Sequence, residues 1–111
     1  METWKDPKTD LEWQNDNPDK MPWDKAIEYA KNLEEGWRLP TIEELETLLN
    51  CTKCNSVTRE EAPFQDSLAY WSSSIDPVYT DCAWYIYFGN GYVDSLNKAN
   101  HYYVRCVRGK L

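Results

Sequence analysis

The chain has 111 residues, 41% of them hydrophobic, which suffices for one hydrophobic core but not for two ordinary domains. We therefore expect a single ligand-binding domain over residues 1–111. The formal net charge is -7, with 12 Lys and Arg against 19 Asp and Glu, which argues against nucleic acid and anionic membrane surfaces as partners. No run approaches the ~20 apolar residues of a membrane span, so membrane insertion is not expected.

The aromatic residues are unusual for a chain of this size, with 6 Trp, 8 Tyr and only 2 Phe. Trp and Tyr combine a large apolar body with a polar tip, and both are favoured at binding surfaces as well as in cores. This composition is the first indication of a recognition module.

The first half of the chain predicts a short strand and two helices. Residues 11–14 are typical of an opening strand that the last strand can meet. Pro22 suits a first helical position, and Gly36 is placed to end that helix in a left-handed cap. Thr41 and Glu44 form a capping box at the start of the second helix. The buried stripes of the two helices are Trp23, Ala26, Ile27, Ala30 and Leu33, then Leu45, Leu48 and Leu49.

The second half of the chain favours strands. Residues 51–66 lack periodicity and predict a long irregular loop. Strands are then expected at 68–73, 81–88, 92–96 and 102–108, with a tight hairpin turn at 89–91. Helices followed by an antiparallel sheet define an α+β fold.

Alternation along residues 81–88 assigns side chains to opposite faces of the hairpin. The side chains expected to face the core are Cys82, Trp84, Ile86 and Phe88. Those expected on the opposite face are Ala83, Tyr85 and Tyr87, joined by Tyr92 and Asp94 from the returning strand. Rigid aromatics with hydroxyl tips suit binding because little side-chain entropy is lost on contact. The alternative is that these tyrosines serve strand propensity and cross-strand pairing.

The four cysteines allow several interpretations. We expect disulfides between Cys51 and Cys54 and between Cys82 and Cys106, which would favour an extracellular setting, and free buried thiols are the alternative. A zinc site of Cys51, Cys54, His101 and one further ligand is a weaker hypothesis, because His101 is the single histidine. A thioredoxin-like redox site is weaker again, since the C-x-x-C pair follows a helix instead of opening one.

Six stretches carry a family resemblance in order and spacing, from about Leu11 to Gly109. They are Leu11-Glu12-Trp13-Gln14, Trp23-Asp24-Lys25-Ala26, Trp37-Arg38-Leu39-Pro40-Thr41 with Glu44-Leu45, Tyr70-Trp71-Ser72-Ser73-Ser74, Ala83-Trp84 with Phe88-Gly89-Asn90-Gly91-Tyr92-Val93, and Tyr103-Val104-Arg105-Cys106-Val107-Arg108-Gly109. Together they resemble the domain family found at the C-terminus of collagen-like bacterial adhesins.

That resemblance implies a C-type-lectin-like fold, related to formylglycine-generating enzymes, and a ligand-binding domain that is extracellular or displayed at the cell surface. The signal or carrier segment is then expected to lie outside this chain, since the first residues lack the pattern of a signal peptide. The partner implied is a protein or glycan, and an oligomer is compatible with the family. The resemblance extends to the variable proteins of diversity-generating retroelements, whose binding residues come from adenine-rich codons in the last third of the chain. The candidate ligand-binding residues are Tyr79, Tyr85, Tyr87, Asn90, Tyr92, Asp94, Ser95, Asn97, Asn100, His101 and Tyr102.

Other functions are weaker hypotheses. A thiol oxidase related to formylglycine-generating enzymes would need two closely spaced reactive cysteines near the C-terminus, and Cys82 and Cys106 are widely separated. A structural cap that oligomerises on a surface fibre is a further alternative. No catalytic set, cofactor or lectin-type calcium motif is evident, so we expect no enzyme activity, cofactor or metal. The residues expected to be structural are Trp37, Trp71 and Trp84 as core anchors and Arg38, Arg105 and Arg108 as hydrogen-bonding groups.

Overall fold

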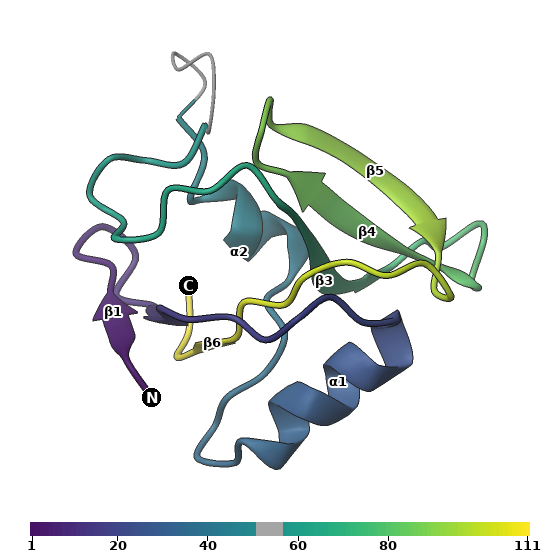
Figure 1. Ribbon diagram of the computed structural model, residues 1–111, viewed down its shortest axis with the longest axis horizontal. Coiled ribbons are helices and arrows are strands. Elements are labelled where there is room, and N and C mark those ends of the chain that lie inside the picture. The colour runs from purple at the N-terminus through teal and green to yellow at the C-terminus, as the bar shows by residue number, and fades with distance from the viewer. Residues whose placement is uncertain (51–56) are drawn as a thin grey trace.

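The computed structural model describes residues 1–50 and 57–111 (Figure 1). The described chain contains two helices and two antiparallel three-stranded sheets, ordered β1-β2-β6 and β3-β4-β5, which confirms the α+β prediction. The elements are β1 (Thr3–Lys5), β2 (Glu12–Gln14), α1 (Trp23–Asn32), α2 (Ile42–Glu46), β3 (Ala69–Ile75), β4 (Cys82–Tyr87), β5 (Tyr92–Asn97) and β6 (Val107–Arg108).

Helix α1 lies where the apolar spacing predicted it, with small differences at both ends. Pro22 is the N-cap residue instead of the first helical residue, and Leu33 is the C-cap. The helix therefore ends before Gly36. The chain then reverses through three consecutive residues with positive φ, at 59°, 53° and 85°: Glu34, Glu35 and Gly36. The left-handed conformation therefore begins at a residue that is not glycine, Glu34. For this reason the glycine signal placed the end of the helix too late.

Helix α2 has the predicted capping box. The Glu44 amide donates to Thr41 Oγ1 at 3.1 Å, and the Thr41 amide donates to Glu44 Oε1 at 2.8 Å. Leu45 and Leu48 are buried as predicted, whereas Leu49 is only half-buried. The helix is short, and the chain beyond it is held by an isolated bridge between Leu49 and Thr58.

The sheet β1-β2-β6 joins the two ends of the chain. The predicted opening strand is β2, and it pairs with the last strand at Trp13 and Val107. Strand β1 was not predicted, and it pairs with β2 on the other side. The last strand is much shorter than the predicted 102–108, because Tyr102 and Tyr103 form isolated bridges to other segments.

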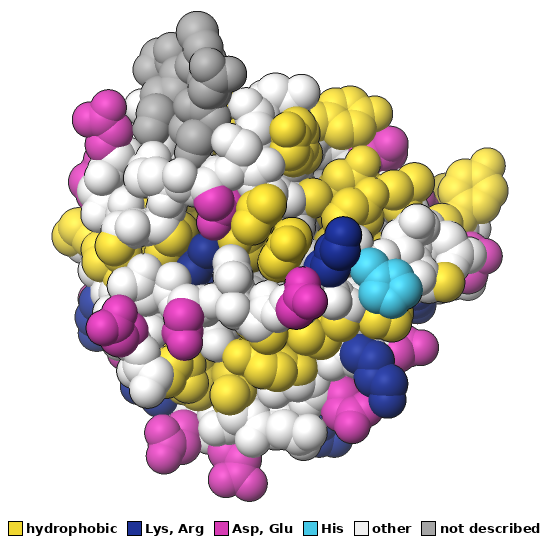
Figure 2. Space-filling model, in the orientation of Figure 1, with side chains coloured by type: hydrophobic (Ala, Val, Ile, Leu, Met, Phe, Trp, Pro, Cys, Tyr) yellow, Lys and Arg dark blue, Asp and Glu magenta, His cyan; other side chains and the backbone are white. Residues whose placement is uncertain are grey.

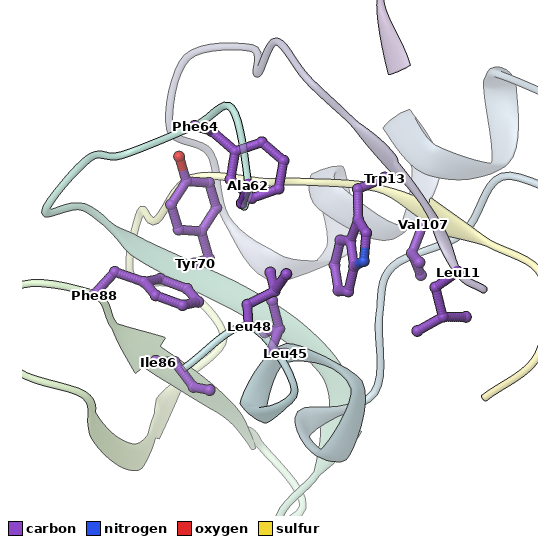
Figure 3. Packing of buried hydrophobic residues seen from close by; sticks show 10 residues of the cluster. All are labelled: Leu11, Trp13, Leu45, Leu48, Ala62, Phe64, Tyr70, Ile86, Phe88 and Val107. Carbon is purple, nitrogen blue, oxygen red and sulfur yellow. The ribbon is translucent and has the colours of Figure 1, made fainter. Parts of the chain in front are cut away.

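Two hydrophobic clusters cover opposite faces of the sheet β3-β4-β5. On one face, Ile86 and Phe88 pack with Leu45 and Leu48, in the cluster drawn in Figure 3. On the other face, Ala83 and Tyr85 pack in a cluster with residues of α1, and the most buried of these are Ala26 and Ala30. Because both faces are partly covered, alternation along β4 does not separate core from solvent.

The expected disulfide between Cys82 and Cys106 is wrong, because both thiols are free. Cys106 is fully buried in the cluster that contains α1, and burial raises its pKa to about 12. Cys82 is half-buried, and it alternates along β4 with Ala83 and Tyr85 of that cluster, so its side chain is directed to the other face. The pairing expected between Cys51 and Cys54 lies outside the described residues.

Candidate functional site

Two exposed tyrosines lie side by side at the end of the β4–β5 hairpin. Tyr87 and Tyr92 are directly opposite in the ladder and are 39% and 54% exposed. Strands β4 and β5 are labelled in Figure 1. In Figure 2, which has the same orientation, hydrophobic side chains gather on the surface over these two strands. We call the surface of Tyr87, Tyr92 and Asp94 the tyrosine surface. The turn that joins the strands includes Gly91 at a φ of 81°, as the predicted tight hairpin requires.

Tyr87 is positioned by a glycine. A Cβ atom added to Gly89 would lie 2.3 Å from Cζ of the Tyr87 ring and 2.5 Å from its hydroxyl oxygen. The ring therefore folds back over the α-carbon of Gly89 and occupies the space that any larger residue would need. The sequence shows both residues, but the ring position could not be read from it.

Asp94 supplies the charge of the tyrosine surface. Its Oδ2 accepts a hydrogen bond from the Tyr92 hydroxyl at 3.2 Å, and its Oδ1 accepts from the Ser95 amide at 2.8 Å. The hydrogen bond to Asp94 raises the pKa of Tyr92, because removing the hydroxyl proton would place two negative charges together. The carboxylate therefore lies at the rim of an exposed aromatic ring.

Tyr85 does not belong to the exposed surface, which corrects the prediction that it faces solvent. It is 8% exposed and stacks on Tyr102 with ring centroids 4.7 Å apart and an interplanar angle of 17°. Tyr102 also meets the Trp71 ring edge to face at 5.0 Å. Burial, followed by the nearby Tyr102 and Asp94, raises the pKa of Tyr85 to about 12. The segment that was predicted as a strand over 102–108 instead places Tyr102 over this part of the sheet.

Most of the other predicted site residues lie toward the far end of β5, whereas Asn90 lies in the hairpin turn and its side chain accepts from the Tyr92 amide at 2.9 Å. Asn97 ends this strand five residues from Tyr92, or about 17 Å at the usual rise per strand residue. Its side chain accepts from the Ala99 amide, and its carbonyl accepts from Asn100, so these two asparagines build a turn. Ser95 is also engaged, donating to Asp76 at 2.7 Å. The remaining predicted residues are exposed: Tyr79, Asn90 and His101.

Sequence reasoning missed an exposed apolar group beside this far end. Ile75 and Val78 are 45% and 76% exposed, next to Tyr79 at 65%. The sequence signal was Val78 directly after Pro77 and Ile75 two residues before it, between the strands predicted at 68–73 and 81–88. The predicted core anchor Trp84 is only half-buried, whereas Trp37 and Trp71 are buried as predicted.

The three arginines are structural, as predicted. Arg38 binds Glu44 through two hydrogen bonds of 2.7 Å, and Arg108 binds Glu12 at 2.8 Å. Arg105 is 3% exposed and donates to the carbonyls of Gln14 and Asn15. These guanidinium groups are therefore engaged within the fold.

A concave surface lies beside α1. A groove of about 520 Å³ has an apolar floor that includes Ile27, Ala30, Trp37 and Leu39. The polar residues at its side are Lys31, Arg38, Thr41 and Ser73, and two of them, Arg38 and Thr41, already hold the start of α2. The groove thus offers apolar contact with few polar groups available to orient a ligand.

Within residues 1–50 and 57–111, no three His, Cys, Asp or Glu side chains are grouped so that they could hold a metal ion. No helix in that part of the chain is both long and apolar enough to cross a membrane. The zinc and redox hypotheses for Cys51 and Cys54 concern residues outside the described part of the chain.

The described residues form a small α+β domain with an exposed aromatic hairpin. The model of the family described as the Lcl C-terminal domain matches residues 2–108, and the chain belongs to this family. That assignment agrees with the resemblance to the C-terminal domains of collagen-like adhesins. No match was found among curated proteins.

Proposed function

We propose that this chain is a non-enzymatic receptor or adhesion domain, displayed outside the cell, that binds a protein or glycan through the tyrosine surface. The observation that carries the proposal is the pair of exposed, adjacent rings of Tyr87 and Tyr92 beside the Asp94 carboxylate. Membership of the Lcl C-terminal domain family supports a surface role. A C-type-lectin-like fold is part of the same proposal.

The exposure of the two rings favours binding over a purely structural role. A tyrosine that only stabilises a hairpin gains most when its ring is covered, as that of Tyr85 is. Tyr87 and Tyr92 instead keep large apolar areas in water. Covering them with a ligand would recover hydrophobic free energy at a small entropy cost, since each side chain has few rotatable bonds.

The retroelement hypothesis is the finer part of the proposal. Several of the residue types that such elements produce are exposed here, at both ends of β5: Tyr79, Tyr87, Asn90, Tyr92, Asn97, Asn100 and His101. The neighbouring DNA tests this part directly. A reverse transcriptase gene and an imperfect repeat of the C-terminal coding segment that differs at adenines would support it, and their absence would contradict it.

The thiol-oxidase alternative is less well supported. Cys106 is buried, and its pKa is raised, which keeps the thiol in its unreactive protonated form. Cys82 lies on the other side of the sheet from the cluster that holds Cys106, so the two thiols are not placed to act together.

The test is the double substitution Tyr87→Ala with Tyr92→Ala. A panel of immobilised glycans and extracellular proteins first identifies a ligand for the wild-type domain. We expect the double variant to melt near the wild-type temperature and to lose at least tenfold in affinity, because hot-spot aromatics often contribute 2 kcal/mol or more. Val78→Ala is the control, since Val78 is an exposed apolar residue in the loop before β4 and is not among the candidate binding residues. Unchanged affinity in a folded double variant would show that the ligand binds elsewhere.

A further inference from the structure

Strand β5 forms the outer edge of the sheet β3-β4-β5. The Lys98 amide donates to the Asp81 carbonyl, on the side of β4 that faces β5. The next carbonyl, that of Cys82, accepts from the Asp76 amide on the opposite side of β4. In an antiparallel ladder, successive residues turn their backbone groups to alternate sides. The pairs that face each other across β4 and β5 are therefore at 83 and 96, 85 and 94, and 87 and 92.

This register directs the backbone groups of three β5 residues away from β4: Val93, Ser95 and Asn97. The Ser95 amide is covered by Asp94 Oδ1 at 2.8 Å, and the Asn97 carbonyl accepts from Asn100 at 3.0 Å. Among the described residues, the four remaining outward groups have no hydrogen-bond partner: the Val93 amide and carbonyl, the Ser95 carbonyl and the Asn97 amide. An extended polypeptide can pair with such an edge.

The tyrosine surface lies beside this edge and is suited to a cation. Asp94 accepts hydrogen bonds from Tyr92 and Ser95, and its carboxylate forms no ion pair among the described residues. The exposed face of the Tyr92 ring adds the negative quadrupole that attracts ammonium and guanidinium groups. A residue paired opposite Asp94 on an added strand would have its Cβ about 5 Å away.

We propose that β5 binds an extended segment of a partner protein by strand addition, and that a Lys or Arg of this segment lies against Tyr92 and Asp94. The inference rests on the proposed function and names the ligand of the same surface. A second copy of this chain is a poorer occupant, because its net charge of -7 would oppose association. Lys98 is held at the far end of β5, where its Nζ donates to the Thr80 carbonyl and lies 4.5 Å from the centroid of the Trp23 ring.

The experiment uses the whole domain and a short blocked peptide in which Lys alternates with Thr. Two peptide controls replace each Lys with Glu, or methylate the backbone amides on the side that would pair with β5. Binding is followed by calorimetry and by amide chemical shifts. We expect the Lys peptide to bind, to shift the Val93 and Ser95 amides, and to bind at least tenfold more tightly than either control.

The protein variants are Asp94→Asn and the charge-matched control Asp24→Asn, on the exposed face of α1. We expect Asp94→Asn to weaken binding of the Lys peptide about tenfold and Asp24→Asn to weaken it less than twofold. Thermal unfolding establishes that both variants are folded. Equal effects of the two substitutions, tight binding of the methylated peptide, or shifts confined to residues away from β5 would each overturn the proposal. If the Tyr87 and Tyr92 double variant loses its panel ligand while the Lys peptide does not bind, the proposed function stands and strand addition is wrong.

Discussion

The position of the Tyr87 ring depends on the absence of a side chain at Gly89. Gly89 does not have the left-handed backbone conformation that favours glycine, so an alanine there strains little besides the ring that it meets. The Tyr87 ring lies at the end of a flexible side chain, so it can rotate away from a methyl group at position 89. Gly89 thus sets the shape of the tyrosine surface at small cost to the fold.

We predict that Gly89→Ala displaces the Tyr87 ring, costs less than about 1 kcal/mol of stability, and lowers ligand affinity as much as Tyr87→Ala does. A double-mutant cycle measures this with the ligand from the panel. In the Tyr87→Ala background, Gly89→Ala should have no further effect on affinity. Additive losses would mean that the glycine acts independently of the ring.

The exposure of individual tyrosines was only partly predictable. Tyr87 and Tyr92 are exposed as alternation predicted, but Tyr85 has the same parity and is buried. Residues distant in the sequence cover it: Tyr102 stacks on its ring, and residues of α1 belong to the same hydrophobic cluster. Periodicity describes one strand at a time, and it carries no information on what a distant segment will cover.

At the scale of elements, α2 has five residues and depends on interactions at its start. Helices this short gain little from propensity alone. Glu44 caps the Thr41 amide and also binds Arg38, so one side chain joins the helix start to the preceding segment. Burial on its own raises the pKa of Glu44, but Arg38 and Thr41 outweigh burial, and the pKa is lowered overall.

We predict that Glu44→Gln destabilises the domain by about 1–3 kcal/mol at pH 7, since glutamine retains the cap but loses the charged hydrogen bonds to Arg38. Because the folded pKa lies below the unfolded value of 4.5, the difference from wild type should shrink as pH falls below 4.5 and be lost as pH falls through the folded pKa. Denaturant unfolding between pH 3 and pH 7 measures it. Glu43→Gln, on the exposed neighbour, is the control and should change stability by about 0.5 kcal/mol or less. A constant difference across this range would show that the charge of Glu44 is not the cause.

The helix starts and the hairpin were predictable because their signals are local. A capping box needs residues three apart, and the turn needs Gly91 at a positive φ. Strand β1 was not predictable, since its three residues form a strand only by pairing with β2. The last strand was overestimated for the same reason, because only Val107 and Arg108 find a continuous partner.

At the scale of the whole molecule, Arg105 connects parts of the chain that are far apart in sequence. It donates to the carbonyls of Gln14 and Asn15, to Asp66 at 3.2 Å and to the Tyr70 hydroxyl at 2.9 Å. Its guanidinium carbon also lies 3.8 Å from the centroid of the Phe64 ring. Removing it would leave several buried acceptors without a donor.

We predict that Arg105→Met costs about 3–5 kcal/mol, as expected when one partner of a buried charged network is removed. Arg108→Met, in the same segment but partly exposed at the rim, should cost much less than Arg105→Met, because an ion pair near the surface contributes little. Denaturant unfolding compares the two. If Arg105→Met does not fold, Arg105→Lys keeps the charge without the planar fork and should show an intermediate loss. Equal costs for the two methionine variants would contradict the assigned role of Arg105.

The small sheet that gathers β1, β2 and β6 also brings both ends of the chain to one side of the molecule, away from β5 (Figure 1). A tether at the first or the last residue would therefore hold the domain by its base and direct the hairpin outward. An immobilised sample can thus be anchored at either end without masking the tyrosines, and crowding many copies on one support would leave each outer strand accessible.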